Sequence, residues 1–131
     1  MMVVDASALV AIAEDEPERD EFLRLMSEQD ALALAPVNYL EAGAVLIARG
    51  RMGSQADLDT WLRALNVTIH DAQLSRAALA AYVRYGKGFH PAKLNLADCF
   101  AYALAKTLDA PLLFKGDDFP RTDITAAAQP T

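Results

Sequence analysis

The chain has 131 residues, the usual size of one domain, and 53% of them are hydrophobic, which excludes an intrinsically disordered protein. Its 18 acidic and 12 basic residues give a net charge of −6. This charge disfavours tight binding of nucleic acid by the surface as a whole, because such affinity comes largely from phosphate contacts. A local site can still differ from the average surface.

The sequence also bears on the cellular setting. Cys99 is the single cysteine, so no internal disulfide can form, which fits a reducing compartment. The start of the chain lacks the basic region of a secretory signal. The longest apolar stretch, residues 31–48, contains Pro36, Asn38 and Glu41, whereas a membrane span needs about 20 apolar residues with few charges. We therefore expect a cytoplasmic protein without a membrane span.

Short apolar runs alternate with helical periodicity in the first half of the chain. The expected elements, in order, are a strand at Val3 and Val4 that ends at Asp5, helices over residues 6–13 and 18–28, a strand over 31–35, and a helix over 36–49 that stops at Gly50. Ser7 is placed to cap the first turn of the helix that begins at residue 6.

The same alternation continues in the second half. The expected elements are a helix over residues 55–65 capped by Ser54, a strand over 67–69, a helix over about 72–84, a loop with Gly86, Gly88 and Pro91, a helix over 94–108 and a strand over 112–114. The tail after about residue 125 is small and polar, and we expect order only at its start.

Strands that alternate with helices predict an α/β fold. We expect one domain over residues 1–131, with a short, mostly parallel central sheet and helices on both faces. In open sheets of this kind, ligands bind at the carboxyl ends of the strands. Asp5 and the segment 115–118 both fall there, so this edge is the expected site.

Three acids lie in apolar surroundings. Asp5 ends an apolar strand, Glu41 precedes seven residues that are all small or aliphatic, and Asp98 lies in the most apolar helix. The pattern predicts helices that are buried on nearly every side. A buried, unpaired carboxylate costs several kcal/mol, so such groups are paired, protonated or bound to a metal.

Each acid also has an ordinary explanation. Asp5 could cap the helix that follows it, and Glu41 could lie on an exposed helical stripe. Asp98 could be an N-cap, although Asn95 is better placed for that role. These explanations require three independent coincidences, whereas a shared functional site explains all three acids together.

Clustered carboxylates predict a hard metal ion. Oxygen ligands without nearby histidine or cysteine select Mg²⁺ or Mn²⁺ rather than zinc. The two histidines, His70 and His90, have no spacing typical of a zinc site. An acidic Mg²⁺ site suits hydrolysis of phosphodiester bonds, because the metal activates water and neutralises the developing charge.

Four segments together resemble a PIN-domain protein, and more narrowly the VapC toxins of VapBC toxin–antitoxin pairs. They are Met-Val-Val-Asp-Ala-Ser-Ala-Leu-Val-Ala (2–11), Tyr-Leu-Glu (39–41), Leu-Asn-Leu-Ala-Asp-Cys-Phe-Ala-Tyr-Ala-Leu-Ala (94–105) and Leu-Leu-Phe-Lys-Gly-Asp-Asp-Phe (112–119). No single segment is specific, but their order and spacing match from residue 3 to residue 124.

The resemblance implies a Mg²⁺-dependent endoribonuclease with Mn²⁺ as a possible substitute. The acids of the family fall on Asp5, Glu41 and Asp98, and Ser7 matches a hydroxyl position near the metal. Asp5 and Asp98 would bind Mg²⁺, and Glu41 would orient the attacking water. The resemblance further implies an RNA substrate, a homodimer, and a VapB-like antitoxin that blocks the site.

The fourth acid of the family falls on Asp117 or Asp118, which are adjacent. Neighbouring side chains of an extended segment point in opposite directions, but Gly116 can turn the chain here. Relatives that share the Lys-Gly-x-Asp-Phe pattern keep the acid just before Phe. The resemblance therefore favours Asp118 as the acid that completes the cluster.

A basic run precedes the helix that carries Asp98. Its members are Arg84, Lys87, His90 and Lys93, which could form a rim that holds RNA phosphates or an ordinary solvated loop. Tyr82 and Tyr85 could stack on bases, although their helical spacing favours packing. Trp61 is expected in the core, and the segment around Met52 and the next helix could belong to a dimer surface or to the core.

Two other functions remain open. A receiver-type phosphoacceptor domain has about this length, an acidic site and a lysine after its last strand, here Lys115. It would need paired acids after its first strand, whereas Asp5 is followed by Ala6 and Ser7. The second alternative is a non-catalytic PIN-fold protein that uses its acids to bind a basic partner.

Overall fold

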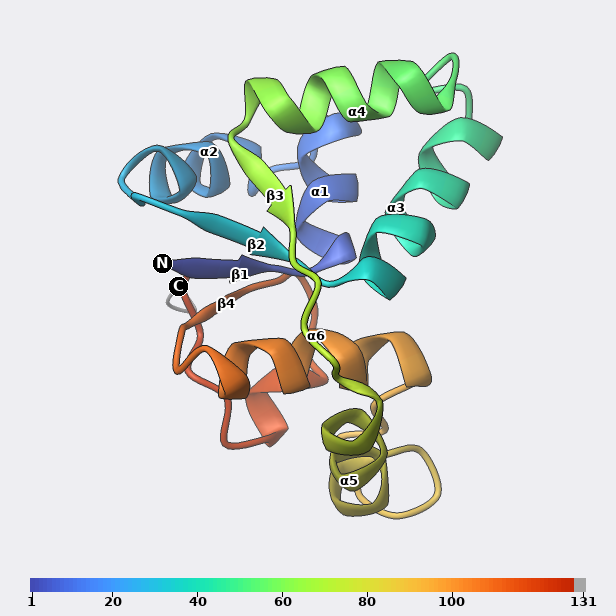
Figure 1. The fold of residues 1–131 in the computed structure, drawn as a ribbon, viewed down its shortest axis with the longest axis vertical. Coiled ribbons are helices and arrows are strands. Elements are labelled where there is room, and N and C mark those ends of the chain that lie inside the picture. Colours follow the sequence, from blue (N-terminus) through green and yellow to red (C-terminus); the bar gives the residue numbers. More distant parts are fainter. Residues whose placement is uncertain (129–131) are drawn as a thin grey trace.

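Four short strands form one parallel sheet in the computed structural model, which describes residues 1–128 (Figure 1). The strands are β1 (Met2–Val4), β2 (Leu32–Leu34), β3 (Val67–Ile69) and β4 (Leu112–Leu113), arranged in the order β3-β2-β1-β4. All three pairings are parallel, and Val3 of the central strand β1 pairs with both Ala33 and Leu112. The predicted parallel sheet is confirmed.

Helices cover both faces of the sheet (Figure 1). The α-helices in residues 1–128 are α1 (Ala6–Ala13), α2 (Arg19–Ser27), α3 (Pro36–Ala48), α4 (Gln55–Ala64), α5 (Ser75–Tyr85) and α6 (Leu96–Thr107). The first four pack on one face of the sheet, and α5 and α6 pack on the other. The predicted α/β architecture is therefore confirmed.

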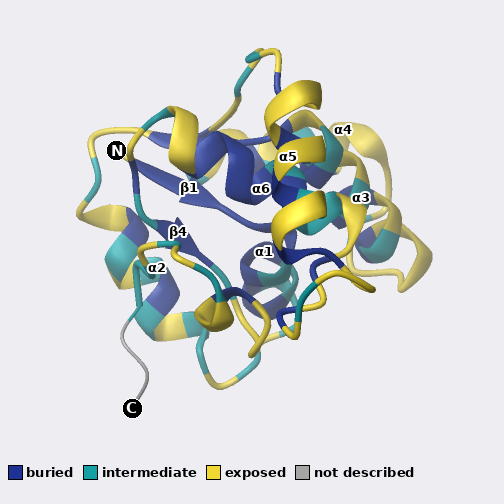
Figure 2. Ribbon diagram, turned by 90° about the horizontal axis from the view of Figure 1, so that it is seen from below, coloured by how far each residue is buried: buried dark blue, intermediate teal, exposed yellow. Residues whose placement is uncertain are grey.

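Alternating strand residues divide the interior into two apolar clusters. Val3 contributes to the cluster that includes residues of α5 and α6, whereas its neighbours Met2 and Val4 contribute to the cluster with α1 and α3. This follows from the two-residue period of a strand, which sends successive side chains to opposite faces. Figure 2 shows the buried strands at the centre of the molecule and the largely exposed helix α5 at its outer surface.

The cap of α1 and the expected starts of α5 and α6 need correction. Asp5, rather than Ser7, is the N-cap of α1, because its carboxylate accepts the Ser7 backbone N–H. Helix α5 begins at residue 75 instead of about 72; His70 Nδ1 accepts the Ala72 N–H and forms a local turn there. Helix α6 begins two residues later than expected, because Leu94 instead pairs with Gly86.

The expectation of burial on nearly every side is confirmed for α6 and wrong for α3. Within α6, Cys99 and residues 101–105 are all buried, and the exposed residues lie at the two ends of the helix. Helix α3 exposes Leu40 and Ile47, so it keeps one solvent-facing side although its sequence is largely apolar. No helix in residues 1–128 combines the length and the apolar character that a bilayer crossing requires.

The chain after residue 124 runs beside β4. The Leu112 N–H donates to the Thr125 carbonyl, and the Ala127 N–H donates to the Leu112 carbonyl, each at 2.9 Å. These bonds satisfy backbone groups on the outer edge of the sheet. The sequence predicted that the tail after about residue 125 is ordered only at its start. Residues 129–131 of this tail lie outside the described residues.

Candidate active site

The first turns of three helices meet at the carboxyl ends of the strands (Figure 1). Asp5 links β1 to α1, Glu41 lies in the second turn of α3, and Asp98 lies in the first turn of α6. Helix N-termini carry partial positive charge, which favours carboxylates at this position. The fold therefore brings together the three acids predicted from the sequence.

Asp5 has one satisfied and one unsatisfied carboxylate oxygen. Its Oδ2 accepts hydrogen bonds from the Ser7 N–H at 3.0 Å and from the Ser7 hydroxyl at 2.6 Å. Its Oδ1 is buried without a hydrogen-bond partner in residues 1–128. Burial raises the pKa of Asp5, although the bonds from Ser7 oppose the shift. Asp5 thus caps a helix and also leaves one oxygen free for a cation.

Ser7 connects Asp5 to the segment after β4. Its hydroxyl oxygen accepts the Lys115 backbone N–H at 3.0 Å while its own proton goes to Asp5 Oδ2. The chain of bonds holds the two segments in a fixed relation, although 108 positions separate Ser7 from Lys115. The hydroxyl therefore positions a site residue.

Asp98 forms a capping box with Asn95. The Asn95 N–H donates to Asp98 Oδ2 at 3.0 Å, and the Asp98 N–H donates to Asn95 Oδ1 at 2.7 Å. Asn95 is therefore the N-cap of α6, as the sequence favoured, and Asp98 is the N3 residue of the capping box rather than the N-cap. The cap does not exclude a second role for this carboxylate.

The electrostatic environment of Asp98 is unfavourable for its charged form. Burial and, after it, the charges of Asp5, Glu41 and Asp118 together raise the pKa of Asp98 to about 7, against the hydrogen bond from Asn95. The three contributing acids are those predicted from the sequence. A carboxylate perturbed by both burial and like charges is typical of a functional site.

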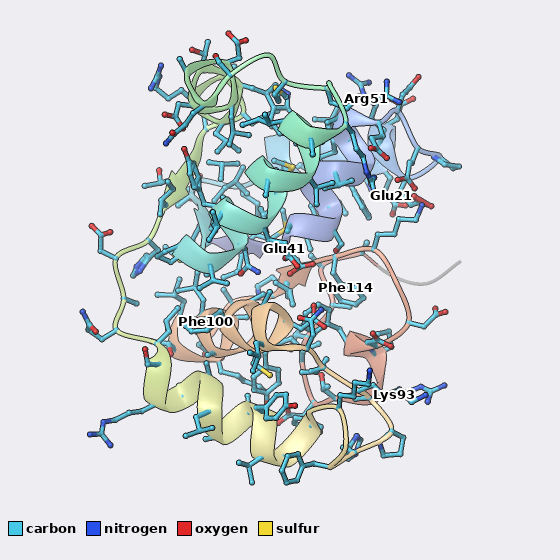
Figure 3. All side chains as sticks on the ribbon, turned by 90° about the vertical axis from the view of Figure 1, so that its right-hand side faces the viewer. Glu21, Glu41, Arg51, Lys93, Phe100 and Phe114 are labelled. Atoms are coloured by element: carbon cyan, nitrogen blue, oxygen red, sulfur yellow. The ribbon has the colours of Figure 1, made fainter. Side chains whose placement is uncertain are left out.

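Glu41 is half-buried, and its charge is coupled to that of Asp5. Burial raises the pKa of Glu41, the charge of Asp5 adds to the shift, and the Asn38 side chain opposes it. In Figure 3, Glu41 points from α3 toward the region between α3 and the lower half of the molecule. Its position on a half-buried face, rather than on a fully exposed stripe, agrees with a role in the site.

Asn38 is a site residue that sequence reasoning missed. It is fully buried, and its Nδ2 donates to the Ala97 carbonyl at 3.1 Å, which fastens α3 to the first turn of α6. Asn38 lies one helical turn before Glu41, and Ala97 adjoins Asp98. An amide three residues before an acid in an apolar helix is the signal that could have identified it.

Of the two adjacent acids, Asp118 is coupled to the site. Its charge is among those that raise the pKa of Asp98, and Asp117 is not among them. Gly116 has φ +124°, a backbone conformation that suits glycine, and it turns the chain before both acids. Asp118 then starts the short 3-10 helix η1 (Phe119–Arg121), whose buried Phe119 packs against Phe114.

A cleft of about 310 Å³ joins these acids to a second group of charges. Asp5, Glu41 and Asp98 line it together with Glu16, Arg49 and Lys115. A larger cavity of about 700 Å³ lies beside the starts of β2 and β3, with Asp30, Arg63 and His70 among its residues. We place the site in the smaller cleft, because the perturbed carboxylates lie there.

The carboxylates fit Mg²⁺ better than they fit a closed metal cage. Within residues 1–128, no three His, Cys, Asp or Glu side chains are placed to hold one ion together. Mg²⁺ needs only one or two protein carboxylates, because it keeps several waters. The buried, unpartnered Asp5 Oδ1 and the destabilised charge of Asp98 are features that such an ion would relieve.

The residues of the basic run before α6 differ in their surroundings. The Arg84 guanidinium lies 4.7 Å from the Tyr85 ring centroid and 3.8 Å from Asp123, so it takes part in packing and ion pairing. Tyr85 is buried and packs against Tyr102, as its helical spacing predicted. Lys93 is exposed and lies on the same side of the molecule as Glu41 (Figure 3). An RNA-binding rim in this loop stays a prediction.

Two other sequence predictions concern packing. Trp61 is partly buried and packs against the cluster that contains Leu58 and Leu62, as expected. Met52 packs against the same cluster. Cys99 is buried, and burial together with the Asp98 charge raises the pKa of its thiol to about 11, as expected for an unreactive cysteine.

Known proteins resemble the chain over nearly its whole length. The family model of the PIN domain matches residues 2–124. Ribonuclease VapC30 of Mycobacterium tuberculosis is 44% identical over 131 residues, which cover 98% of this chain and 100% of that protein. Ribonuclease VapC of Mycolicibacterium smegmatis is 43% identical and covers 95% of this chain, with 98% of its own length matched.

A solved structure supports the same assignment of the fold. Mycobacterium tuberculosis VapC20, described as a toxin that cleaves the sarcin–ricin loop, matches with a TM-score of 0.74 at 17% sequence identity. The match covers 99% of this chain and 100% of VapC20. The sequence motifs, the parallel sheet with its acids at the carboxyl ends, and these relatives lead to one conclusion. The chain belongs to the PIN-domain family, within its VapC group.

Proposed function

We propose that the protein is a Mg²⁺-dependent endoribonuclease and the toxin of a toxin–antitoxin pair. The observation that carries the proposal is a set of electrostatically coupled carboxylates, with one buried oxygen unpartnered, at the carboxyl ends of the strands. The relatives that cover nearly the whole chain are named ribonucleases, which supports the same activity.

Asp5 and Asp98 would hold the metal. The unpartnered Oδ1 of Asp5 would be one ligand, and the Asp98 carboxylate, whose charge is destabilised by burial and by like charges, would be the other. When bound, Mg²⁺ supplies electrostatic stabilisation of the phosphate and lowers the pKa of water. Ser7 and Asn95 orient the two carboxylates through their hydrogen bonds.

Glu41 and Asp118 complete the chemistry in this proposal. The oxygen of water would form a bond to phosphorus, the bond from phosphorus to the leaving ribose oxygen would break, a proton of the attacking water would pass to Glu41, and the leaving oxygen would take a proton from solvent. The raised pKa of Glu41 makes it a stronger base than an ordinary carboxylate. Asp118 adds negative charge on the outer side of the cluster, where it would help to retain the metal with its waters.

The partners follow from the proposed role as a toxin. The substrate is RNA, and a VapB-like antitoxin would block the cleft in the cytoplasm. A homodimer is also part of the proposal. Exposed apolar side chains support it: Leu79 and Val83 lie one turn apart on α5, with 64% and 55% of their surfaces exposed.

The two alternative functions are less well supported. A receiver-type domain has the doubly wound strand order 2-1-3-4-5, whereas this sheet has the order β3-β2-β1-β4. A non-catalytic PIN-fold protein would not need to keep an unpartnered buried carboxylate oxygen, which costs stability.

RNA cleavage tests the proposal directly. Purified protein is incubated with structured RNA in Mg²⁺, in Mn²⁺ and in EDTA, and the products are separated by size. We expect discrete fragments with either metal and intact RNA in EDTA. DNA of the same sequence is the control substrate. Cleavage that persists in EDTA would overturn the metal dependence, and intact RNA in every condition would overturn the ribonuclease activity.

A further inference from the structure

Two cations line the cleft together with the acids. Arg49, the residue that follows α3, and Lys115, which follows β4 by two residues, are the cations among its lining residues in the described part of the chain. The remaining charged side chains of the lining are the acids Asp5, Glu16, Glu41 and Asp98. Arg49 and Lys115 are therefore the groups of the lining that can attract an anion into a cleft that is acidic as a whole.

Acidic side chains from one loop hold both cations. Arg49 Nη1 lies 2.8 Å from Glu14 Oε1. Lys115 Nζ forms an ion pair with Glu16 and lies 3.1 Å from Glu18 Oε2. The three glutamates belong to the connection between α1 and α2. Ion pairs therefore link this loop to the residues that follow α3 and β4.

The ion pairs leave the cations accessible. The Arg49 side chain is 56% exposed and the Lys115 side chain 37% exposed. Their glutamate partners are less exposed, between 16% and 33%. A phosphate group can therefore reach the cations from the solvent side, where it competes with the glutamates. Arginine and lysine are the side chains that bind phosphate groups most effectively.

We propose that Arg49 and Lys115 form a phosphate-binding subsite for the RNA strand next to the cleaved bond. Glu14, Glu16 and Glu18 hold the two cations while no RNA is bound, and they compete with the RNA backbone. The subsite explains how an acidic protein retains a polyanion beside a cluster of carboxylates. The inference rests on the proposed ribonuclease function and deepens it.

If the ion pairs had a purely structural role, substitution of the glutamates would affect RNA binding differently from what the subsite predicts. If the ion pairs only fasten the loop, removing either partner has the same effect. If Lys115 binds phosphate, its loss weakens RNA binding, whereas the loss of Glu16 releases Lys115 and strengthens RNA binding. The signs of the two changes therefore separate the two roles.

The test measures binding apart from cleavage. Fluorescence anisotropy follows a labelled single-stranded RNA of mixed sequence, titrated with protein in EDTA at several salt concentrations. Lys115→Met and Arg49→Met are compared with Lys106→Met, in which a lysine paired with Asp123 is lost at the far end of α6. Glu16→Gln is compared with Glu28→Gln, in which the exposed partner of Arg24 is neutralised. Each control matches the change in net charge.

We expect Lys115→Met and Arg49→Met each to weaken binding about fivefold near 0.1 M salt, and to reduce the salt slope by about 0.7, the contribution of one phosphate contact on a single strand. Glu16→Gln should tighten binding more than Glu28→Gln does. In the cleavage assay, Lys115→Met should raise KM more than it lowers kcat.

The outcomes separate this inference from the proposed function. If the wild type binds and cleaves RNA while Lys115→Met and Arg49→Met behave like Lys106→Met, the subsite is wrong and the ribonuclease stands. A wild type that does not bind the RNA even at low salt would also overturn the subsite. If the wild type binds the RNA with the expected variant effects but cleaves none, the subsite stands and the ribonuclease fails.

Discussion

Two carboxylates lie at opposite ends of α6 and differ in what surrounds them. Near the carboxyl end of the helix, Asp123 accepts a hydrogen bond from the Tyr102 hydroxyl and lies 3.2 Å from Lys106 Nζ. These partners lower the pKa of Asp123, the Tyr102 bond most strongly. At the amino end, burial and three like charges raise the pKa of Asp98 to about 7.

The difference indicates which acid stabilises the fold and which serves a site. Asp123 ties the C-terminal segment to α6 through donors and cations, so its charge is favourable in the folded state. Asp98 caps α6 but remains among other acids that destabilise its charge. A position that stays unfavourable in the folded protein is a mark of function rather than of stability.

The largest effect is expected for Asp98→Asn. Asparagine keeps an oxygen that can accept the Asn95 N–H, so the helix cap and the fold should remain, while the proposed metal ligand is lost. We expect cleavage of structured RNA in Mg²⁺ to fall about a hundredfold or more, the range seen for essential catalytic groups. Circular dichroism checks the fold. Undiminished cleavage by the folded variant would remove Asp98 from the mechanism.

The pair Asp118→Asn and Asp117→Asn should also separate clearly. Asp118 acts on the pKa of Asp98, so its loss should reduce cleavage far more than the loss of Asp117. Both residues are exposed, and both variants should fold. Single-turnover cleavage rates compare them at equal protein concentration. A larger loss from Asp117→Asn would reverse the assignment of the fourth acid.

The stability of the two regions should depend on pH with opposite signs. Because the pKa of Asp98 rises from 3.8 to about 7 on folding, the folded state must accept an unfavourable charge as the pH rises through this range. The melting temperature in EDTA should therefore fall by several degrees between about pH 5 and pH 8. Asp98→Asn, which lacks this titration, should show a smaller fall, and an equal fall would contradict the prediction.

Asp123 affects the stability of the protein in the acidic pH range instead. Its lowered pKa adds stability above its ordinary value near 3.8, and this stability is lost as the pH falls through the lowered pKa of the folded state.

Metal binding should relieve the repulsion at the amino end of α6. At ten times its dissociation constant, one bound Mg²⁺ adds about 1.4 kcal/mol to the free energy of unfolding, or a few degrees in melting temperature. Asp5→Asn should show a smaller shift, because it replaces the unpartnered oxygen that would bind the ion. Equal shifts in both proteins would mean that the ion binds elsewhere.

The smallest effect is expected at Asp123. Asp123→Ala removes the acceptor of the Tyr102 hydroxyl and the partner of Lys106, and should cost about 1 kcal/mol of stability. Chemical denaturation measures this loss. RNA cleavage below the unfolding range should stay at the wild-type rate. A loss of cleavage without a loss of stability would contradict the division between the two ends of α6.

The sequence by itself predicted the fold class and singled out three acids that line one cleft in the structure. Alternating strands and helices implied the parallel sheet, because local apolar periodicity reports secondary structure directly. Acids at Asp5, Glu41 and Asp98 were recognisable, because a carboxylate in an apolar run is expensive to bury. Their charge coupling in the structure agrees with that prediction.

Only the tertiary structure decided which side of each helix faces solvent and what each acid contacts. Local sequence does not show that α3 keeps a solvent-facing side, and it therefore overestimated the burial of this helix. Asn38 became a site residue because α3 meets the first turn of α6. Arg49 and Lys115 line one cleft although they follow different elements, α3 and β4. These relations are set by packing between distant segments, which a local pattern does not encode.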